Sequence, residues 1–293
     1  MRILFVTSSR IGDAVLSTGL LDHLLRQYPD ARFTVACGPV AAGLFTHMPR
    51  LETLIVFDKR RYSRHWLGLW WQCVFTRWAL VVDIRASALS WLLPTWRRAV
   101  MRKRPGHKTA QLAAILGLSP PPLPVAWTGP ADRAKAAALV PADGPVIALG
   151  PTANWSGKVW PATRFIALFQ ALRAGPLPGA RALVLAGPGA YEQALAQPVL
   201  DALPDAINLC GTLNLSEAAA CLGRAAMFIG NDSGLMHLAA ATGTPTLGLF
   251  GPTSAEEYGP AGRTTAIARS ADQTMAGLSV EAALAAATGL LAG

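Results

Sequence analysis

The feature that most limits the possible folds of this chain is an alternation of two kinds of apolar segment. Short runs rich in β-branched and aromatic residues, such as RILFVTSS and PVIALGPT, are separated by longer segments with apolar residues at helical spacing. Strands that alternate with helices in this way form βαβ units, in which the strands run parallel in one sheet. The sequence therefore predicts an α/β fold built on parallel sheets.

A proline-rich stretch divides this alternation into two series. Residues 118–143 read LSPPPLPVAWTGPADRAKAAALVPAD and show little periodicity apart from a short alanine-rich piece. With 293 residues the chain is near the length at which one domain usually becomes two. We predict an N-terminal domain over residues 1–143, which includes this linker, and a C-terminal domain over residues 144–293.

Charge is divided unevenly between these two parts. Residues 1–143 hold 19 Lys+Arg and 8 Asp+Glu, a net of +11, whereas the rest hold 7 and 9, a net of −2, which together give the +9 of the whole chain. The basic half indicates an anionic partner such as a membrane surface, an acidic glycolipid or nucleic acid. No apolar run is long enough to span a membrane, so we expect a globular chain.

The cysteines and the first apolar run bear on localisation. Cys37, Cys73, Cys210 and Cys221 lack the spacing of metal ligands, which favours reduced thiols in the cytoplasm over disulfides or a metal site. The first apolar run ends at Ser8 after only a few residues, and we interpret it as a buried strand rather than a signal peptide.

The segment GNDSGLMHLAAATGTPTLGLFGPT, residues 230–253, is the strongest candidate for a binding site. A strand ends before it, and helical spacing begins after Gly234, so the amides of Ser233 and Gly234 should lie at a helix N-terminus that binds an anion. The alternative is that Asp232 or Ser233 only caps the helix. His237 lies one turn into the helix, where it either faces the anion or is a structural residue.

Two further segments follow strands and should lie near the same place, because ligands of open α/β sheets bind beyond the carboxyl ends of the strands. Gly251, Pro252 and Thr253 would form an opposite wall. The loop GPTANWSGKVWP, residues 150–161, contains Thr152, Asn154 and a lysine, Lys158, that could neutralise a diphosphate; the alternative is an ordinary surface lysine. Neither a Walker motif nor GxGxxG is present.

Two carboxylates also follow predicted strands. Asp13, in SSRIGDAVLSTGLL, would lie in the first turn of a helix, where it either only stabilises the helix or accepts a proton from a substrate hydroxyl. Glu192 follows Gly187 in AGPGAYEQA and could bind a ribose or be a solvated helix residue.

Basic residues interleaved with tryptophan form two segments, KRRYSRHW at 59–66 and WRRAVMRKRPGHK at 96–108. This pattern is typical of a surface at lipid headgroups, although a solvated basic face has the same composition. The arginines expected to contact an acceptor or a membrane are Arg10, Arg60, Arg61, Arg64, Arg97 and Arg98.

Three of these motifs together resemble the heptosyltransferases of lipopolysaccharide core synthesis, glycosyltransferase family 9. They are S-x-IGD ending at Asp13, K-x-WP beginning at Lys158, and residues 230–253, followed by Tyr-Gly-Pro. The resemblance is faint between residues 58 and 143. It implies the GT-B architecture, with two Rossmann-like domains facing across a cleft, the acceptor on the N-terminal domain and the nucleotide sugar on the C-terminal one.

The resemblance also implies residue roles and a reaction. Asp13 would be the general base, Lys158 and the amides of Ser233 and Gly234 would hold the donor diphosphate, and Asp232 would bind the transferred sugar. The remaining candidates for donor binding are Thr152, Asn154, Gly187, Glu192, His237, Gly251, Pro252 and Thr253. The implied reaction is an inverting, metal-independent transfer of heptose from ADP-heptose to a Kdo-lipid A type acceptor, with no cofactor other than the ADP-sugar donor.

This hypothesis places a monomer peripherally at the cytoplasmic face of the inner membrane. Three alternatives stay open. The donor could be another nucleotide sugar or the acceptor another acidic glycolipid, the chain could bind a nucleotide sugar without transferring it, or the basic half could bind nucleic acid, for which the sequence contains no recognisable motif.

Overall fold

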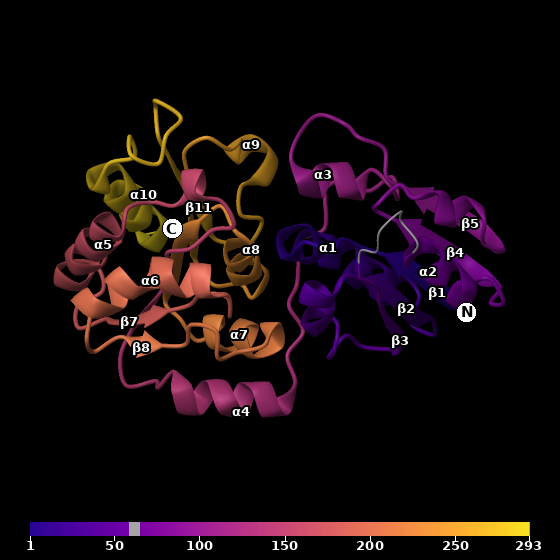
Figure 1. The fold of residues 1–293 in the computed structure, drawn as a ribbon, viewed down its shortest axis with the longest axis horizontal. Coiled ribbons are helices and arrows are strands. Elements are labelled where there is room, and N and C mark those ends of the chain that lie inside the picture. The colour runs from indigo at the N-terminus through magenta and orange to yellow at the C-terminus, as the bar shows by residue number, and fades with distance from the viewer. Residues whose placement is uncertain (59–64, 293) are drawn as a thin grey trace. The chain divides into compact units, whose positions relative to one another are not determined.

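The computed structural model describes residues 1–58 and 65–292, which form two compact units, Met1–Trp127 and Thr128–Gly293 (Figure 1). Each unit contains its own sheet, and every strand pair in both sheets is parallel. The predicted α/β fold with two parallel sheets is confirmed. The cleft expected between the two domains stays a prediction.

The first unit is built on a sheet of five strands in the order β3-β2-β1-β4-β5. The strands are β1 (Arg2–Val6), β2 (Arg32–Cys37), β3 (Leu51–Val56), β4 (Trp78–Asp83) and β5 (Thr95–Val100). Its helical elements are α1 (Ile11–Gln27), η1 (Pro39–Leu44), α2 (His65–Cys73), η3 (Ala88–Trp91) and α3 (Lys108–Ala113), where η marks a 3₁₀ helix. Strand β1 is central, so the loop that follows it lies in the middle of the sheet edge.

The second unit is built on a sheet of six strands in the order β11-β10-β9-β6-β7-β8. The strands are β6 (Val146–Gly150), β7 (Arg181–Val184), β8 (Ile207–Asn208), β9 (Met227–Asn231), β10 (Thr246–Phe250) and β11 (Thr265–Arg269). The helical elements are α4 (Pro130–Leu139), η4 (Ser156–Lys158), α5 (Ala162–Ala174), α6 (Ala190–Ala202), α7 (Leu215–Leu222), α8 (Gly234–Ala241), α9 (Ala255–Tyr258) and α10 (Val280–Ala292).

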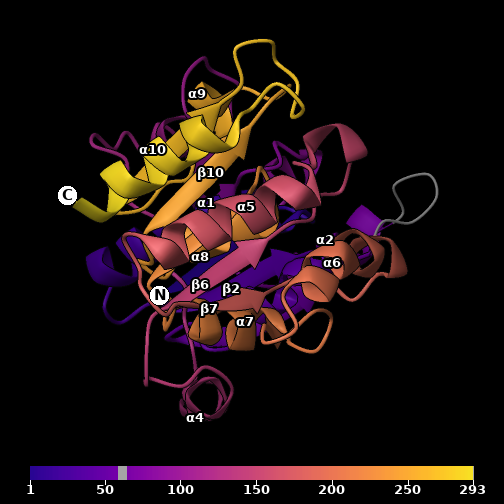
Figure 2. The ribbon, with the colours of Figure 1, turned by 90° about the vertical axis from the view of Figure 1, so that its left-hand side faces the viewer.

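The core of the second unit forms where α5 and α10 cover one face of its sheet (Figure 2). Helix α5 buries Phe165, Leu168 and Leu172 at helical spacing, which gives it one continuous apolar face. The fully buried Trp160 ring packs edge-on against Phe165, and its Nε1 donates a hydrogen bond of 2.9 Å to the Leu278 carbonyl. Trp160 therefore fixes the end of the loop 150–161 in the core.

The structure differs from the sequence-based expectation in the segment 118–143. The two units divide between Trp127 and Thr128, earlier than the boundary expected at residue 143, because α4 packs on α7 of the second unit. Lys135 of α4 forms an ion pair of 2.8 Å with Glu217 of α7. The alanine-rich piece is thus part of the second unit rather than of a linker.

A second difference concerns the basic segments. Residues 95–100 form the edge strand β5, although the arginines and tryptophan there suggested only a surface segment.

Within the described ranges, no helix is long and apolar enough to cross a membrane. All four cysteines are free.

The packing of α4 gives a stability prediction. Ala136 on α4 is buried, whereas its neighbour Ala137 is exposed. We expect Ala136→Asp to lower the free energy of unfolding by about 2–4 kcal/mol, because it places a carboxylate in an apolar contact. Ala137→Asp is the matched control and should change it by less than about 1 kcal/mol in urea titrations, mainly through lower helix propensity. Equal effects of the two changes would show that α4 is not packed on the second unit.

Candidate functional site

The carboxyl ends of four parallel strands of the second unit meet at one edge of its sheet. Strand β6 leads into Thr152, β7 into Gly187, β9 into Asp232, and β10 into Gly251. Because β10, β9, β6 and β7 are consecutive neighbours in the sheet, the predicted donor-binding segments are brought to the same edge.

A buried amide holds two of these segments together. The side chain of Asn231, at the end of β9, is fully buried, and its Oδ1 accepts a hydrogen bond of 3.0 Å from the backbone N–H of Trp160. Its Nδ2 donates one of 3.5 Å to the Thr152 carbonyl. Asn231 therefore fixes the loop of residues 150–161 at both ends. The sequence gave no sign of the role of Asn231 as a tie.

The loop held in this way carries Lys158, which forms an ion pair with Asp232. The Lys158 Nζ lies 2.7 Å from Asp232 Oδ2, and the two side chains are 21% and 8% exposed. Lys158 is therefore not an ordinary surface lysine. Removing charges partly from water has a cost that a close partner of opposite charge offsets, so each side chain holds the other in place.

The N-terminus of α8 lies directly after this aspartate. Ser233 is the N-cap residue, but its side chain makes no capping hydrogen bond, and its Oγ is buried without a partner among the described residues. The Asp232 side chain accepts a hydrogen bond from Lys158, and the Ser233 side chain does not cap the helix. The structure therefore does not show the alternative in which Asp232 or Ser233 serves only as a helix cap. The first amides of the eight-residue helix have no partner within it and favour an anion.

A second hydroxyl at this sheet edge is in the same situation. Thr253 Oγ1, in the loop after β10, is buried and has no hydrogen-bond partner in the described part of the chain. Buried polar atoms are nearly always bonded to protein, water or ligand. Two such hydroxyls in the loops that follow neighbouring strands therefore indicate a place for a polar ligand.

Glu192 ties a further pair of loops together. Its Oε2 accepts hydrogen bonds of 2.9 Å from the Gly187 amide and 2.9 Å from Thr152 Oγ1. A Cβ at position 187 would lie 2.9 Å from Glu192 Oε1, so a larger residue there would displace the Glu192 carboxylate from these bonds. Glu192 is therefore more than a solvated helix residue, and its contact with a ribose stays a prediction.

The Cys210 thiol lies near Glu192. Its pKa is raised to about 11, mainly because the thiol is buried and to a smaller extent because of the Glu192 charge.

The remaining candidates of the second unit differ in exposure. Asn154 and Pro252 are exposed, Gly251 is buried, and His237 is buried on α8. A Cβ at Gly251 would lie 2.7 Å from the Met275 amide nitrogen, so the backbone there passes directly against the next loop. A role for these residues in donor binding stays a prediction.

In the first unit, Asp13 lies half-buried in the first turn of α1, after the central strand β1. Ser8 Oγ accepts a hydrogen bond of 3.1 Å from the Arg10 amide and donates a long one of 3.4 Å to Asp13 Oδ2. Ser8, rather than Asp13, thus satisfies the amide of the N-cap residue Arg10. This arrangement leaves the carboxylate at the sheet edge available for other chemistry.

Sequence reasoning missed a second carboxylate close in the fold. Asp83 is fully buried at the end of β4, the neighbour of β1, and accepts hydrogen bonds from the amides of Arg85 (2.8 Å) and Ser87 (2.9 Å). The turn passes through Ala86 at a φ of +51°, in the left-handed region. It holds Arg85, whose Nη1 donates a bond of 3.4 Å to Ser9 Oγ in the loop before Asp13. An aspartate directly after the run ALVV was the available signal.

The predicted acceptor-side arginines are only partly described. Arg60, Arg61 and Arg64 lie outside the described residues. Arg10 is exposed, as are Arg97 and Arg98 on β5. The Arg98 guanidinium also donates hydrogen bonds to the carbonyls of Ser90 (2.7 Å) and Leu93 (2.9 Å).

Over residues 1–58 and 65–292, no group of three or more His, Cys, Asp or Glu side chains is placed to hold a metal ion.

Comparison with known proteins gives consistent results. Residues 91–286 match the family model of glycosyltransferase family 9 (heptosyltransferase). The lipooligosaccharide heptosyltransferase 2 of Haemophilus influenzae is 25% identical over 316 residues, which cover 89% of this chain and 86% of that protein.

Solved structures show the same fold. A family 9 glycosyltransferase of Veillonella parvula superposes with a TM-score of 0.85 at 19% identity, covering 99% of this chain and 97% of that one. The Escherichia coli heptosyltransferase WaaC with ADP gives a TM-score of 0.77 at 19% identity, covering 96% and 97%.

The Asn231 tie can be tested by stability. Asn231→Leu removes the acceptor of the buried Trp160 amide, and we expect the free energy of unfolding to fall by about 1–3 kcal/mol, the cost of an unsatisfied buried group. Asn208→Leu is the control, because Asn208, at the end of β8, is exposed and its side chain accepts a hydrogen bond from the Cys210 amide, only two residues away. Urea titration measures both, and an unchanged midpoint for Asn231→Leu would show that the tie contributes nothing.

Proposed function

We propose that this chain transfers a heptose from ADP-heptose to the lipopolysaccharide core. The proposal proceeds from its family, because the chain belongs to glycosyltransferase family 9, the heptosyltransferases, and is accordingly a glycosyltransferase. The donor, the acceptor and the residue roles below are the parts that we propose. The observation that carries them is the N-terminus of α8, with buried unpartnered hydroxyls on Ser233 and Thr253 and with Lys158 close by.

This arrangement suits a nucleoside diphosphate. The α8 amides and the two hydroxyls offer hydrogen-bond donors to phosphate oxygens, and Lys158 offers a positive charge. The pyrophosphate bears the charge that grows as the sugar–oxygen bond breaks, and fixed donors that meet growing charge lower the barrier. The fold shared with a heptosyltransferase whose structure contains ADP supports adenine as the base.

The Lys158–Asp232 pair explains how the donor would be divided between two residues. When a phosphate oxygen takes the place of the carboxylate at Lys158 Nζ, Asp232 is free to accept hydrogen bonds from the hydroxyls of the transferred sugar. The two roles expected of these residues are thus compatible with their contact in the structure.

Asp13 would supply the base. An acceptor hydroxyl is a weak nucleophile until a carboxylate removes its proton. The acceptor oxygen then bonds the anomeric carbon, the bond from that carbon to the diphosphate breaks, and the proton goes to Asp13. One direct displacement of this kind inverts the configuration, and the charge on the leaving group is met by Lys158 and the α8 amides without a metal. We place the acceptor, an acidic glycolipid of the Kdo-lipid A type, at the cytoplasmic face of the inner membrane.

The donor assignment predicts a selective loss of nucleotide affinity. Lys158→Met should weaken ADP binding about 10- to 100-fold, the contribution of a charged hydrogen bond of about 1.5–3 kcal/mol. Lys135→Met is the matched control, since Lys135 also pairs with a carboxylate but lies on α4. Calorimetric titration with ADP, against GDP and UDP, measures the effect. A folded wild-type protein that binds no nucleoside diphosphate would contradict the proposal.

The base assignment predicts a loss of turnover alone. Asp13→Asn keeps the shape of the side chain but accepts no proton, so kcat should fall by about 10²- to 10⁴-fold while ADP-heptose still binds. Asp22→Asn, further along α1, is the control and should leave kcat within a factor of about two, because Asp22 forms only a surface ion pair with Arg26. Transfer assays with Kdo-bearing lipid A measure the rates. Full turnover by Asp13→Asn would exclude this residue as the base.

A further inference from the structure

Helix α2 has an unusual outer face. Its sequence, HWLGLWWQC, contains no Asp, Glu, Lys or Arg. Leu69 and Cys73 are buried in the core of the first unit and account for one apolar face. Leu67, Trp71 and Phe75, at spacing i, i+4, i+8 along α2 and just beyond its end, form a second apolar face that points to solvent. A surface helix normally carries polar residues there.

Three further exposed apolar side chains, Trp91, Leu92 and Trp96, come from η3, the residue after it and β5. In the β4–β5 register, Val81 pairs with Arg98, and Val81 packs in the same core cluster as α2 and η3. Arg98, and Trp96 two residues earlier, therefore lie on the side that α2 and η3 cover. Trp70 Nε1 of α2 donates a hydrogen bond of 3.2 Å to the Leu92 carbonyl, which joins α2 to the end of η3.

We call the resulting patch the aromatic surface. Its members are 64–80% exposed, where isolated apolar residues would need no explanation but a continuous group does. They are Leu67, Trp71, Phe75, Trp91, Leu92 and Trp96. The Trp71 and Phe75 rings contact one another edge-on with centroids 5.2 Å apart, and the Trp70–Leu92 hydrogen bond joins their helix to the end of η3.

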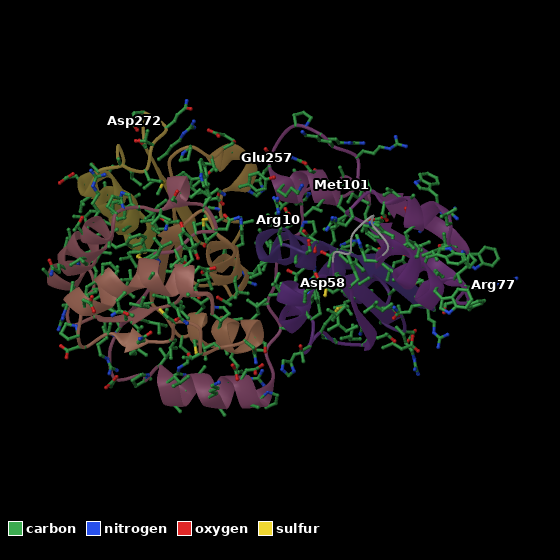
Figure 3. All side chains as sticks on the ribbon, viewed as in Figure 1. Arg10, Asp58, Arg77, Met101, Glu257 and Asp272 are labelled. Carbon is green, nitrogen blue, oxygen red and sulfur yellow. The ribbon has the colours of Figure 1, made fainter. Side chains whose placement is uncertain are left out.

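The segment that carries the aromatic surface, residues 65–127, has exposed charges of one sign. Residues 65–127 contain eight Lys+Arg, whereas Asp83 is their single acidic residue and is fully buried. The Arg98 guanidinium lies 5.9 Å from the centre of the Trp91 ring, on the side of the sheet that carries Trp96. Arg77, just after Phe75, points outward at the margin of the unit (Figure 3). The segment thus combines exposed apolar and aromatic side chains with basic ones.

We propose that the aromatic surface docks the first unit on an anionic lipid bilayer. Tryptophan favours the boundary between headgroups and acyl chains, and the leucines and Phe75 gain from burial below it. Arginines around the patch meet the phosphates of anionic lipids, whose surface potential attracts basic segments. A second copy of this chain is a poorer occupant, since it would bring two basic faces together. The inference uses none of the residues assigned to donor binding or transfer.

The test is binding of the full chain to vesicles. Phosphatidylcholine vesicles with phosphatidylglycerol should bind the wild type at least about tenfold more tightly than vesicles of phosphatidylcholine alone, and high salt should weaken the binding. Co-sedimentation gives the partition coefficient. The double variant Phe75→Ser/Trp96→Ser should lower it at least about tenfold, because it removes the two most exposed side chains of the surface.

Matched controls separate the aromatic surface from general effects. Ile267→Ser removes an exposed apolar side chain on β11, and it should leave vesicle binding unchanged. For charge, Arg77→Glu should reduce binding to anionic vesicles, whereas Arg173→Glu on α5 should not. ADP titration and thermal unfolding of each variant verify that the fold and the nucleotide site are intact, so failure of the proposed transferase function would be seen separately.

Three results would overturn the proposal. They are absence of wild-type binding to anionic vesicles, equal binding to neutral and anionic vesicles, and equal binding by the wild type and both surface variants. Concentration-dependent dimerisation that Phe75→Ser/Trp96→Ser abolishes, without vesicle binding, would assign the surface to a second copy instead and would likewise overturn it. Loss of vesicle binding in both surface variants alone, with nucleotide binding retained in all, would support it.

Discussion

Parallel pairing of all strands in each sheet requires the chain to cross from one end of the sheet to the other after every strand. Each crossing begins at a carboxyl end, so the loops after β6, β7, β9 and β10 must open at one edge. Polar residues in those loops meet whether or not they are near in sequence. Lys158 and Asp232, which are 74 positions apart, contact one another for this reason.

The loops at that edge are fixed by side chains rather than by a ligand. Asn231 holds the loop with Lys158 through the Trp160 amide, and Glu192 joins the loops after β6 and β7. Ser233 and Thr253 keep buried hydroxyls without partners, although most buried polar groups are satisfied. The rigid ties and the unsatisfied groups belong together, because only a fixed frame can keep donors away from other partners until a ligand arrives.

The sequence predicted the parts of this arrangement that depend on local pattern. Strand and helix alternation predicted both sheets, and a polar turn before a helix predicted the α8 terminus. The pairing of Lys158 with Asp232 was not predictable, because it depends on which strands are neighbours in the sheet. The same holds for Asn231 and Asp83, whose roles come from long-range or turn geometry. The exposure of the outer face of α2 could not be predicted, because a helical segment without charged residues is typical of a buried helix.

The Asp232 carboxylate has a further consequence for the binding of anions at Lys158. It is a tethered anion held 2.7 Å from the Lys158 ammonium, so every free anion must displace a partner of high effective concentration. In the proposed function, chloride or a single phosphate would bring little to that exchange, whereas a pyrophosphate would also engage the helix amides and the two hydroxyls. The ion pair would therefore compete with small anions for Lys158 and would form again when the nucleotide leaves.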